Sequence, residues 1–246
     1  MPRFNPLLDQ LATYPAVAVD ARKAELLASG RMVYDFGKGD PEEPPPAFVS
    51  EALRAAVVPR MPYPKVKGSL AVREAIAAYF SRRFGVTLDP DTQIVPTSGS
   101  KEAVFHLPLL VVDRDADDRG VVFPDPGYPA YQRGALFAGG EAIAVHLSGD
   151  HIIRPWTLDP AIIARTRLIW LNSPHNPSGA VMGLDDLRRA AEFCREHDIL
   201  LVCDETYADV YHSQPPHSLL ETGTDGVLVL HSTSKRSGMT GYRSGF

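Results

Sequence analysis

The sequence predicts an α/β protein built on a three-layer, mainly parallel sheet. From Gln93 onwards, short apolar runs rich in Val, Ile and Leu alternate with helical stretches. The runs end at Pro, Asn, Asp or Ser, which are typical of strand ends. Alternation of this kind favours parallel pairing with helices on both faces. The expected strands are residues 93–96, 121–123, 142–147, 167–171, 199–203 and 227–231.

Three helices are predicted from apolar spacing and from helix stop and start signals. The first two cover about 47–57 and 69–84, and Gly85 is expected to end the second. The third is an amphipathic helix at about 185–197, between the fourth and fifth strands, with Asp185 as its expected cap.

The first 46 residues are predicted to form an irregular arm ahead of the main body. Three consecutive prolines at 44–46 favour extended backbone and block a helix. We therefore divide the chain into residues 1–46 and a large domain of residues 47–246.

The composition argues against several classes of protein. A net charge of −5 does not suit a broad nucleic-acid surface, which needs a basic excess. No apolar run approaches the roughly 20 residues of a membrane span, and the N-terminus has no apolar signal core. Cys194 and Cys203 lie in apolar segments without metal-ligand spacing. Reduced core thiols in a cytoplasmic protein are expected.

Polar residues follow the predicted strands, at the sheet edge where ligands bind in α/β proteins. Ser98-Gly99-Ser100 follows the first run and opens a helix, where amides and hydroxyls bind phosphate. Taken alone, this turn fits an ordinary helix cap equally well. Tyr128 follows the second run and could stack on a flat ring, or be a packed loop tyrosine.

Two further strand ends carry an amide and a carboxylate. The turn Asn172–Gly179 contains two X-Pro steps, which would hold the amide of Asn176 rigidly toward a ligand. His175 is expected to be a bystander in this turn. Asp204 ends a buried run, where a carboxylate is costly unless it is paired. A protonated pyridine nitrogen is one such partner, and a helix-capping role is the alternative.

The sixth run is followed by Ser232, Ser234 and Lys235. A lysine here is usually a surface residue. In this chain it would share one edge with a phosphate turn, a ring-stacking tyrosine, an amide and a carboxylate. This set suits pyridoxal 5′-phosphate (PLP), whose aldehyde forms a Schiff base with lysine.

These motifs resemble those of the class I/II aminotransferases, which are PLP-dependent enzymes of fold type I. Ser-x-Ser-Lys-x₅-Gly-x-Arg-x-Gly spans Ser232–Gly245, and Asn-x-Pro-x-Asn-Pro-x-Gly spans Asn172–Gly179. Asp204-x-x-Tyr207 matches the ring-binding motif, and Gly39-Asp40-Pro41 resembles the Gly-Glu-Pro turn. The resemblance covers essentially the whole chain. It implies a PLP-binding large domain at 47–246 and an incomplete small domain that includes part of 1–46.

The resemblance implies a role for each matching residue. Lys235 would bind PLP and carry the substrate proton, and Asp204 would pair with the pyridine nitrogen. Tyr207 and Asn176 would bind the ring hydroxyl, and Tyr128 would stack on the ring. The residues expected to bind the phosphate are Ser98, Gly99, Ser100, Ser232 and Arg243.

Other matching residues imply a dimer and a substrate site. Tyr63 would reach the phosphate of a neighbouring subunit, so the active unit would be a homodimer. Gly39 would lie beside the substrate carboxylate, together with Asn176. Lys101 and Lys38 are candidates for a distal carboxylate, although Lys101 fits a solvated helix-start lysine equally well.

The implied reaction moves an amino group between an amino acid and a 2-oxo acid, with ping-pong kinetics. The segment around Lys235 looks especially like N-succinyldiaminopimelate aminotransferases, with aspartate-type enzymes also similar. Both favour an acidic or dicarboxylic substrate with glutamate and 2-oxoglutarate as partners.

Three other interpretations remain open at this point. A PLP-dependent β-lyase would use the same cofactor residues. An aminotransferase-like sensor domain would need a DNA-binding module before it. An inactive truncated fragment is the third, because family members continue well beyond Phe246 and carry there the arginine that binds the substrate α-carboxylate. We expect the chain to be part of a longer protein or a truncated product.

Overall fold

The computed structural model describes residues 2–11, 14–37 and 39–246. The described chain divides into two compact units, Met1–Glu42 and Glu43–Phe246. This division falls four residues before the boundary drawn from the sequence after residue 46. Each unit is described by itself.

The first unit contains two helical segments, so the prediction of an irregular arm is wrong for this part. A 3₁₀ helix covers Pro6–Gln10, and α1 covers Pro15–Ala28. Proline at the first position of each segment suits the first turn, where its missing N–H is not needed. The rest of α1 contains five alanines and two leucines, which favour a helix.

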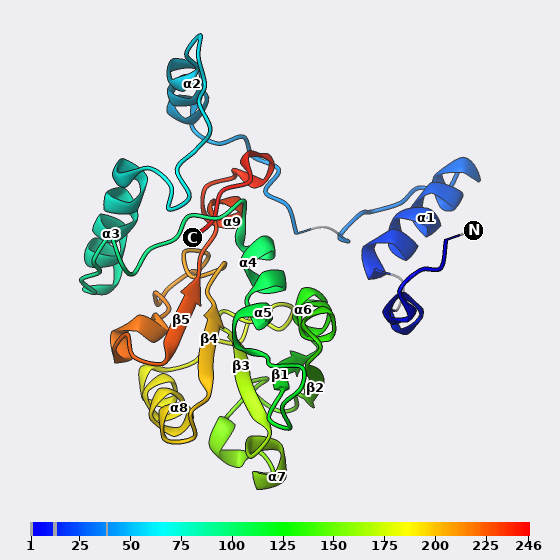
Figure 1. Cartoon of the computed structure of the whole chain (residues 1–246). Helices are drawn as coiled ribbons and strands as arrows, with labels where there is room; N and C mark the ends of the chain where they lie inside the picture. Colours follow the sequence, from blue (N-terminus) through cyan, green and yellow to red (C-terminus); the bar gives the residue numbers. More distant parts are fainter. Residues whose placement is uncertain (1, 12–13, 38) are drawn as a thin grey trace. The chain divides into compact units, whose positions relative to one another are not determined.

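The second unit is built on a five-stranded parallel sheet in the order β2-β1-β3-β4-β5 (Figure 1). Its strands are β1 Gly120–Asp125, β2 Glu141–His146, β3 Thr166–Asn172, β4 Leu200–Asp204 and β5 Val227–Leu230. The prediction of a mainly parallel sheet is therefore confirmed. Asn172 pairs in register with Asp204, which pairs with Leu230, so these three strands end side by side.

The first predicted strand, residues 93–96, is not a strand in the structure. Ile94 is buried, whereas Val95 is 64% exposed, so the apolar run has no second buried position. Pro96 also lacks the N–H that a ladder requires. Only Thr97 makes a bridge, antiparallel to Gly245, which also bridges Ser232.

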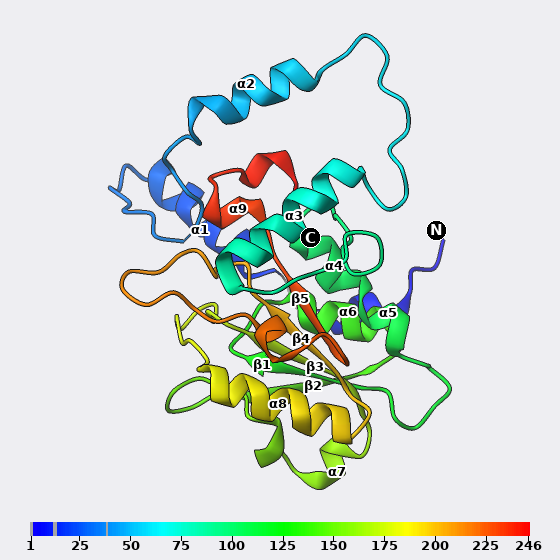
Figure 2. The ribbon, with the colours of Figure 1, turned by 90° about the vertical axis from the view of Figure 1, so that its left-hand side faces the viewer.

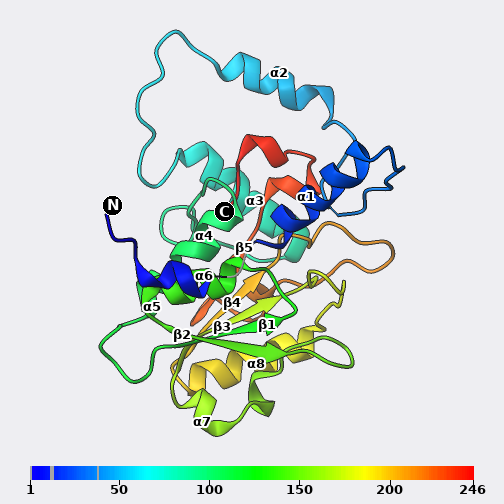
Figure 3. The same cartoon turned by 90° about the vertical axis from the view of Figure 1, so that its right-hand side faces the viewer.

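Helices cover both faces of the sheet (Figures 2 and 3). On one face, α8 (Leu184–Glu196) packs Leu187 and its neighbours against Ile169 and Leu171 of β3. On the other face, Leu168 and Trp170 of β3 pack with residues of α4 and α6. Helices α4 and α6 cover Ser100–His106 and Ala130–Ala138, and α5 covers Pro108–Val111 between them. Alternate residues of β3 face opposite layers, which explains its continuous apolar sequence.

The predicted helix at 69–84 forms as α3, Leu70–Phe84. The Ser69 hydroxyl accepts from the amide of Val72 at its start, and Gly85 ends it with a φ of +69°. The stop signal read from the sequence, Gly85, is confirmed. Its buried residues Ile76 and Phe80 belong to a third apolar cluster with Leu88 and Ile94.

Helices α2 and α8 differ in detail from the prediction. Helix α2 covers Ala47–Ala56, one residue shorter than expected, and none of its residues is buried. Gly183, not Asp185, is the N-cap of α8. Asp185 lies in the first turn instead, where a carboxylate interacts favourably with the helix dipole.

The remaining helical segments of the second unit are short. They are α7 (Pro160–Ile163), α9 (Thr233–Arg236) and four-residue or shorter 3₁₀ turns at Pro155–Thr157, Leu219–Thr222 and Thr240–Tyr242. No helix in the described ranges has the length and apolar character needed to cross a membrane.

Candidate active site at the carboxyl edge of the sheet

Asp204 ends β4 and is 7% exposed. Its Oδ1 accepts hydrogen bonds from the amide (3.1 Å) and hydroxyl (2.7 Å) of Thr206. Its Oδ2 accepts from the hydroxyl of Tyr131 at 3.0 Å. These three donors replace the water that the carboxylate loses on burial, which would otherwise be costly.

Tyr131 and Thr206 are contacts of Asp204 that sequence analysis did not single out. Tyr131 is fully buried, and its ring stacks on Trp170 with centroids 5.0 Å apart. Burial, and then the charge of Asp204, raises the pKa of Tyr131 well above its ordinary value, so its hydroxyl remains a donor. Their places in the sequence could have identified them. Tyr131 ends the turn that contains Tyr128, and Thr206 lies between Asp204 and Tyr207.

Asn172 connects the turn after β3 to the end of β4. Its Nδ2 donates to the backbone oxygens of Asp204 (2.8 Å) and Pro174 (3.1 Å). Its Oδ1 accepts from the amide of Asn176 at 2.7 Å. The half-buried Asn176 is therefore fixed relative to Asp204, as a rigid turn was expected to achieve.

His175 is not the bystander that the sequence suggested, because it joins two turns of the site. The ring is buried, with Nε2 3.0 Å from the carbonyl of Pro126 and Nδ1 2.7 Å from the hydroxyl of Ser178. Burial lowers the pKa of His175. In the neutral ring, Nε2–H donates to Pro126 and Nδ1 accepts from Ser178.

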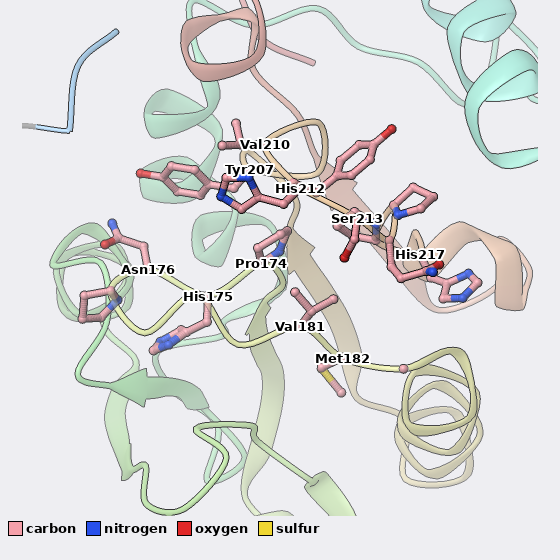
Figure 4. Close-up of a pocket in the computed structure, with 17 residues that line it drawn as sticks. Pro174, His175, Asn176, Val181, Met182, Tyr207, Val210, His212, Ser213 and His217 are labelled. Atoms are coloured by element: carbon pink, nitrogen blue, oxygen red, sulfur yellow. The ribbon is translucent and has the colours of Figure 1, made fainter.

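A pocket of about 690 Å³ opens between the turn after β3 and the loop after β4 (Figure 4). Asn176 and Tyr207 lie on the same side of it. The rest of its lining is mostly proline, valine and histidine, and none of the described lining residues is Asp, Glu, Lys or Arg. The pocket therefore adjoins two of the expected ring-binding residues and is otherwise formed by uncharged side chains.

Lys235 lies in the single turn α9, whose start is fixed by Ser232. The buried Ser232 hydroxyl accepts from the amide of Ser234 at 3.1 Å and donates to the carbonyl of Ser244 at 3.3 Å. Lys235 itself is half-buried. The serines around the lysine thus hold its backbone in a defined turn.

A second set of residues connects α9 to the loop after β4. The Asp209 carboxylate accepts from the Tyr79 hydroxyl (2.9 Å) and pairs with Arg83 (3.0 Å) and Arg236 (2.9 Å). The Arg236 guanidinium also lies 4.1 Å from the centroid of the Tyr79 ring. We call these four residues the Asp209 cluster. Because Arg236 directly follows Lys235, the cluster fixes the turn that carries the lysine.

A buried hydrogen-bonded pair of side chains lies beside both Asp204 and Ser232. Glu205 and His231 are 0% and 2% exposed, and their side chains are 2.8 Å apart. The other oxygen of Glu205 accepts from the Leu219 amide at 2.7 Å. The His231 ring stacks on Phe246 with centroids 5.4 Å apart. The pair therefore joins the ends of β4 and β5.

The residues expected to bind a phosphate are close together. Arg243 donates to the carbonyl of Ser98 at 3.4 Å, and a Cβ added to Gly99 would lie 2.4 Å from Arg243 Nη2. Gly99 has a φ of +91°, which suits glycine. The Ser100 hydroxyl is 3.2 Å from that of Thr206, which in turn contacts Asp204.

Two other predicted residues, Tyr63 and Lys101, have exposed side chains. Tyr63 is 99% exposed, in the segment between α2 and α3. Lys101 is exposed in the first turn of α4. Gly39 belongs to the first unit, and Lys38 lies outside the described residues.

The sheet is parallel, and its carboxyl edge carries a lysine, a buried aspartate and a turn beside an arginine. This combination is the one expected of a PLP-dependent enzyme, and the comparison with known proteins agrees. The chain belongs to the class I and II aminotransferase family, whose family model matches residues 26–246. The fold is that of the large domain of fold type I PLP-dependent transferases, and the family uses PLP.

Three relatives illustrate the similarity. An LL-diaminopimelate aminotransferase from Gloeobacter violaceus is 38% identical over 97% of this chain and 62% of its own length. Substrate-bound BacF from Bacillus subtilis superposes with a TM-score of 0.91 and 29% identity, over 100% of this chain and 63% of its own. Thermus thermophilus aspartate aminotransferase superposes with a TM-score of 0.90 and 29% identity, over 100% and 64%. The chain thus spans less than two thirds of these relatives.

Two features of this structure are compatible with bound PLP: the spare acceptor capacity of Asp204 and the amide and guanidinium groups near Ser98. The Asp204 carboxylate has accepted three hydrogen bonds, and a carboxylate can accept about four. At the phosphate end, the amide of Ser98 already binds an anionic oxygen, that of Glu102 at 2.7 Å. Arg243 adds a cation beside this amide. An amide that donates to an anionic oxygen, a guanidinium beside it and a carboxylate that can accept one more hydrogen bond are features with which PLP is compatible.

Proposed function

We propose that the protein is an aminotransferase, which moves an amino group between an amino acid and a 2-oxo acid with PLP as cofactor. One observation carries this proposal. Hydrogen bonds link Asp204 to Thr206 and, through the Thr206 hydroxyl, to Ser100, and another links the backbone of Ser98 to Arg243. This connection supports the proposal, because the proposed ring-nitrogen partner and the proposed phosphate-binding residues belong to one hydrogen-bonded edge of the sheet.

The proposed roles follow from the chemistry of each side chain. PLP, when bound, supplies an electron sink for the electrons released at the substrate α-carbon. Lys235 provides the amine that holds the cofactor and then accepts and returns the α-proton. Asp204 accepts the N–H of the ring nitrogen. Tyr207 and Asn176 donate to the ring hydroxyl, and Tyr128 stacks on the ring.

The phosphate is proposed to bind the hydroxyls and amides around Gly99 together with Ser232 and the Arg243 guanidinium. Arginine suits this role because it presents several fixed donors to phosphate oxygens. Its guanidinium already lies against Gly99, so the turn and this cation would hold the phosphate together.

We propose an acidic or dicarboxylic amino donor, with glutamate and 2-oxoglutarate as the exchange pair. Support comes from the names of two relatives, an LL-diaminopimelate and an aspartate aminotransferase, because both amino acids carry two carboxylates. Lys101 is proposed to meet the distal carboxylate, and Gly39 and Asn176 to lie near the α-carboxylate.

A cytoplasmic homodimer is the proposed form of the protein. Helix α2 has no buried residue, and the apolar side chains of Phe48 and Val66 are 67% and 102% exposed. A surface of this kind favours burial against another chain. Tyr63, which lies in the same stretch, is proposed to reach the phosphate site of the second subunit. Residues 1–46 are proposed to form an N-terminal arm and part of the small domain.

The experiment is a donor panel with 2-oxoglutarate as acceptor, with glutamate formation measured and Lys235→Ala as the inactive control. We expect transfer from dicarboxylic donors, which the variant abolishes. Ammonia and pyruvate from a β-substituted amino acid, released without any acceptor, would instead identify a β-lyase. Activity that survives in Lys235→Ala would contradict the proposal.

A further inference from the structure

Tyr131 connects two parts of the site that different elements supply. It lies in α6, three residues after Tyr128, and the two rings meet edge to face with centroids 5.9 Å apart. Its hydroxyl crosses to Asp204 at the end of β4. One side chain thus contacts both the proposed ring-stacking residue and the proposed partner of the ring nitrogen.

The hydrogen bonds of Asp204 are unequally divided between its two oxygens. Oδ1 accepts twice, from the amide and hydroxyl of Thr206, and Oδ2 accepts once, from Tyr131. Each carboxylate oxygen accepts about two hydrogen bonds. The remaining acceptor position is therefore on Oδ2, the oxygen that Tyr131 holds.

We propose that Tyr131 is a positioning residue, which together with Thr206 fixes the Asp204 carboxylate so that one lone pair of Oδ2 remains for the cofactor ring nitrogen. This role rests on the proposed function. Without the Tyr131 hydroxyl, Oδ2 has no fixed donor, and the carboxylate is held through Oδ1 alone. The cofactor then loses a preorganised acceptor, which weakens its binding.

Trp170 provides a matched control for the packing of Tyr131. Its ring stacks on Tyr131 at an interplanar angle of 26°, and both side chains are fully buried. Trp170 Nε1 has no hydrogen-bond partner among the described residues. Trp170→Phe therefore disturbs the same stack without removing a donor from Asp204.

The test measures PLP dissociation constants by absorbance titration for the wild-type protein, Tyr131→Phe and Trp170→Phe. Loss of a hydrogen bond to a charged acceptor is expected to weaken PLP binding by about tenfold in Tyr131→Phe. Trp170→Phe is expected to remain within about twofold. In turnover, kcat should fall in Tyr131→Phe while the KM for the amino donor stays unchanged, because Tyr131 does not touch substrate.

Several outcomes would overturn the proposal. An unchanged PLP dissociation constant in Tyr131→Phe would refute it, and so would an equal weakening in both variants, which would mean packing alone. If Tyr131→Phe does not fold, Thr206→Val removes one donor from Oδ1 and is expected to weaken PLP binding severalfold. No change in that variant would refute the arrangement. A wild-type protein that binds no PLP would overturn the proposed function and this role together.

Discussion

Removal of the Asp209 carboxylate should destabilise the second unit strongly. The side chains of Asp209, Arg83 and Arg236 are 19%, 18% and 28% exposed, so the carboxylate is largely shielded from water. In Asp209→Ala, two arginines lose their shared counter-ion, and the Tyr79 hydroxyl loses its acceptor. That hydroxyl stays protonated because burial, and then the charge of Asp209, raises the pKa of Tyr79.

The magnitude follows from these contacts. A hydrogen bond to a charged group contributes about 1.5–3 kcal/mol, and removing one partner of a buried ion pair costs about 3–5 kcal/mol. Arg83 keeps its bonds to the carbonyls of Ala208 (3.1 Å) and Pro216 (3.2 Å), and Arg236 can regain some water, so the lower part of this range applies. We expect a loss of about 3 kcal/mol in the free energy of unfolding.

Urea denaturation followed by circular dichroism measures this loss. With a slope of about 3 kcal/mol/M, the midpoint should fall by about 1 M. The control is Asp185→Ala, which removes an aspartate that is 99% exposed and pairs with Arg188 at 3.2 Å. Exposed pairs contribute about 0–1 kcal/mol, so its midpoint should barely move. Equal losses in both variants would refute the reasoning.

Three further predictions concern the phosphate turn and two buried titratable groups. Gly99→Ala should weaken PLP binding at least tenfold, because the added Cβ would lie 2.4 Å from Arg243 Nη2 and the backbone φ is +91°. The control Gly183→Ala should leave PLP binding unchanged, because its added Cβ would have no atom within 4 Å. Burial lowers the pKa of His175, so the free energy of unfolding should fall as the pH drops below about 6.5. Urea titrations at pH 7.5 and 5.5 measure this change, which should be smaller in His175→Asn. Burial raises the pKa of Cys194 to about 12, so iodoacetamide should label it slowly at pH 8 in the native protein and rapidly in urea.

The fold was predictable where one sequence signal determined the local structure. The strands β1, β3 and β4 are buried on both faces, and this explains their continuous apolar sequences, whereas β2 at the sheet edge is largely exposed. Ser69 and Gly85 mark the ends of α3 through their own side-chain and backbone preferences. Residues 93–96 look similar in sequence, yet they form no strand, because strand formation depends on a partner that the local sequence does not specify.

The shared edge of the proposed site residues was predictable from strand ends, whereas the hydrogen bonds among them were not. Asp204 ends β4, and Asn176 and Lys235 lie in the turns after β3 and β5, so their common edge follows from parallel topology. Tyr131 comes from a helix, and its contact with Asp204 depends on the packing of α6 against the sheet. The role of Asp209 likewise depends on α3, which lies more than a hundred residues away in sequence.

The most direct test of the account is reduction of the PLP-treated protein with borohydride, followed by peptide mass mapping. The account predicts a visible absorption band that is lost on reduction, with the stable adduct on Lys235. The band should be absent in Lys235→Ala. A protein that stays colourless with PLP, or one that carries the adduct mainly on another lysine such as Lys101, would contradict the central assignment.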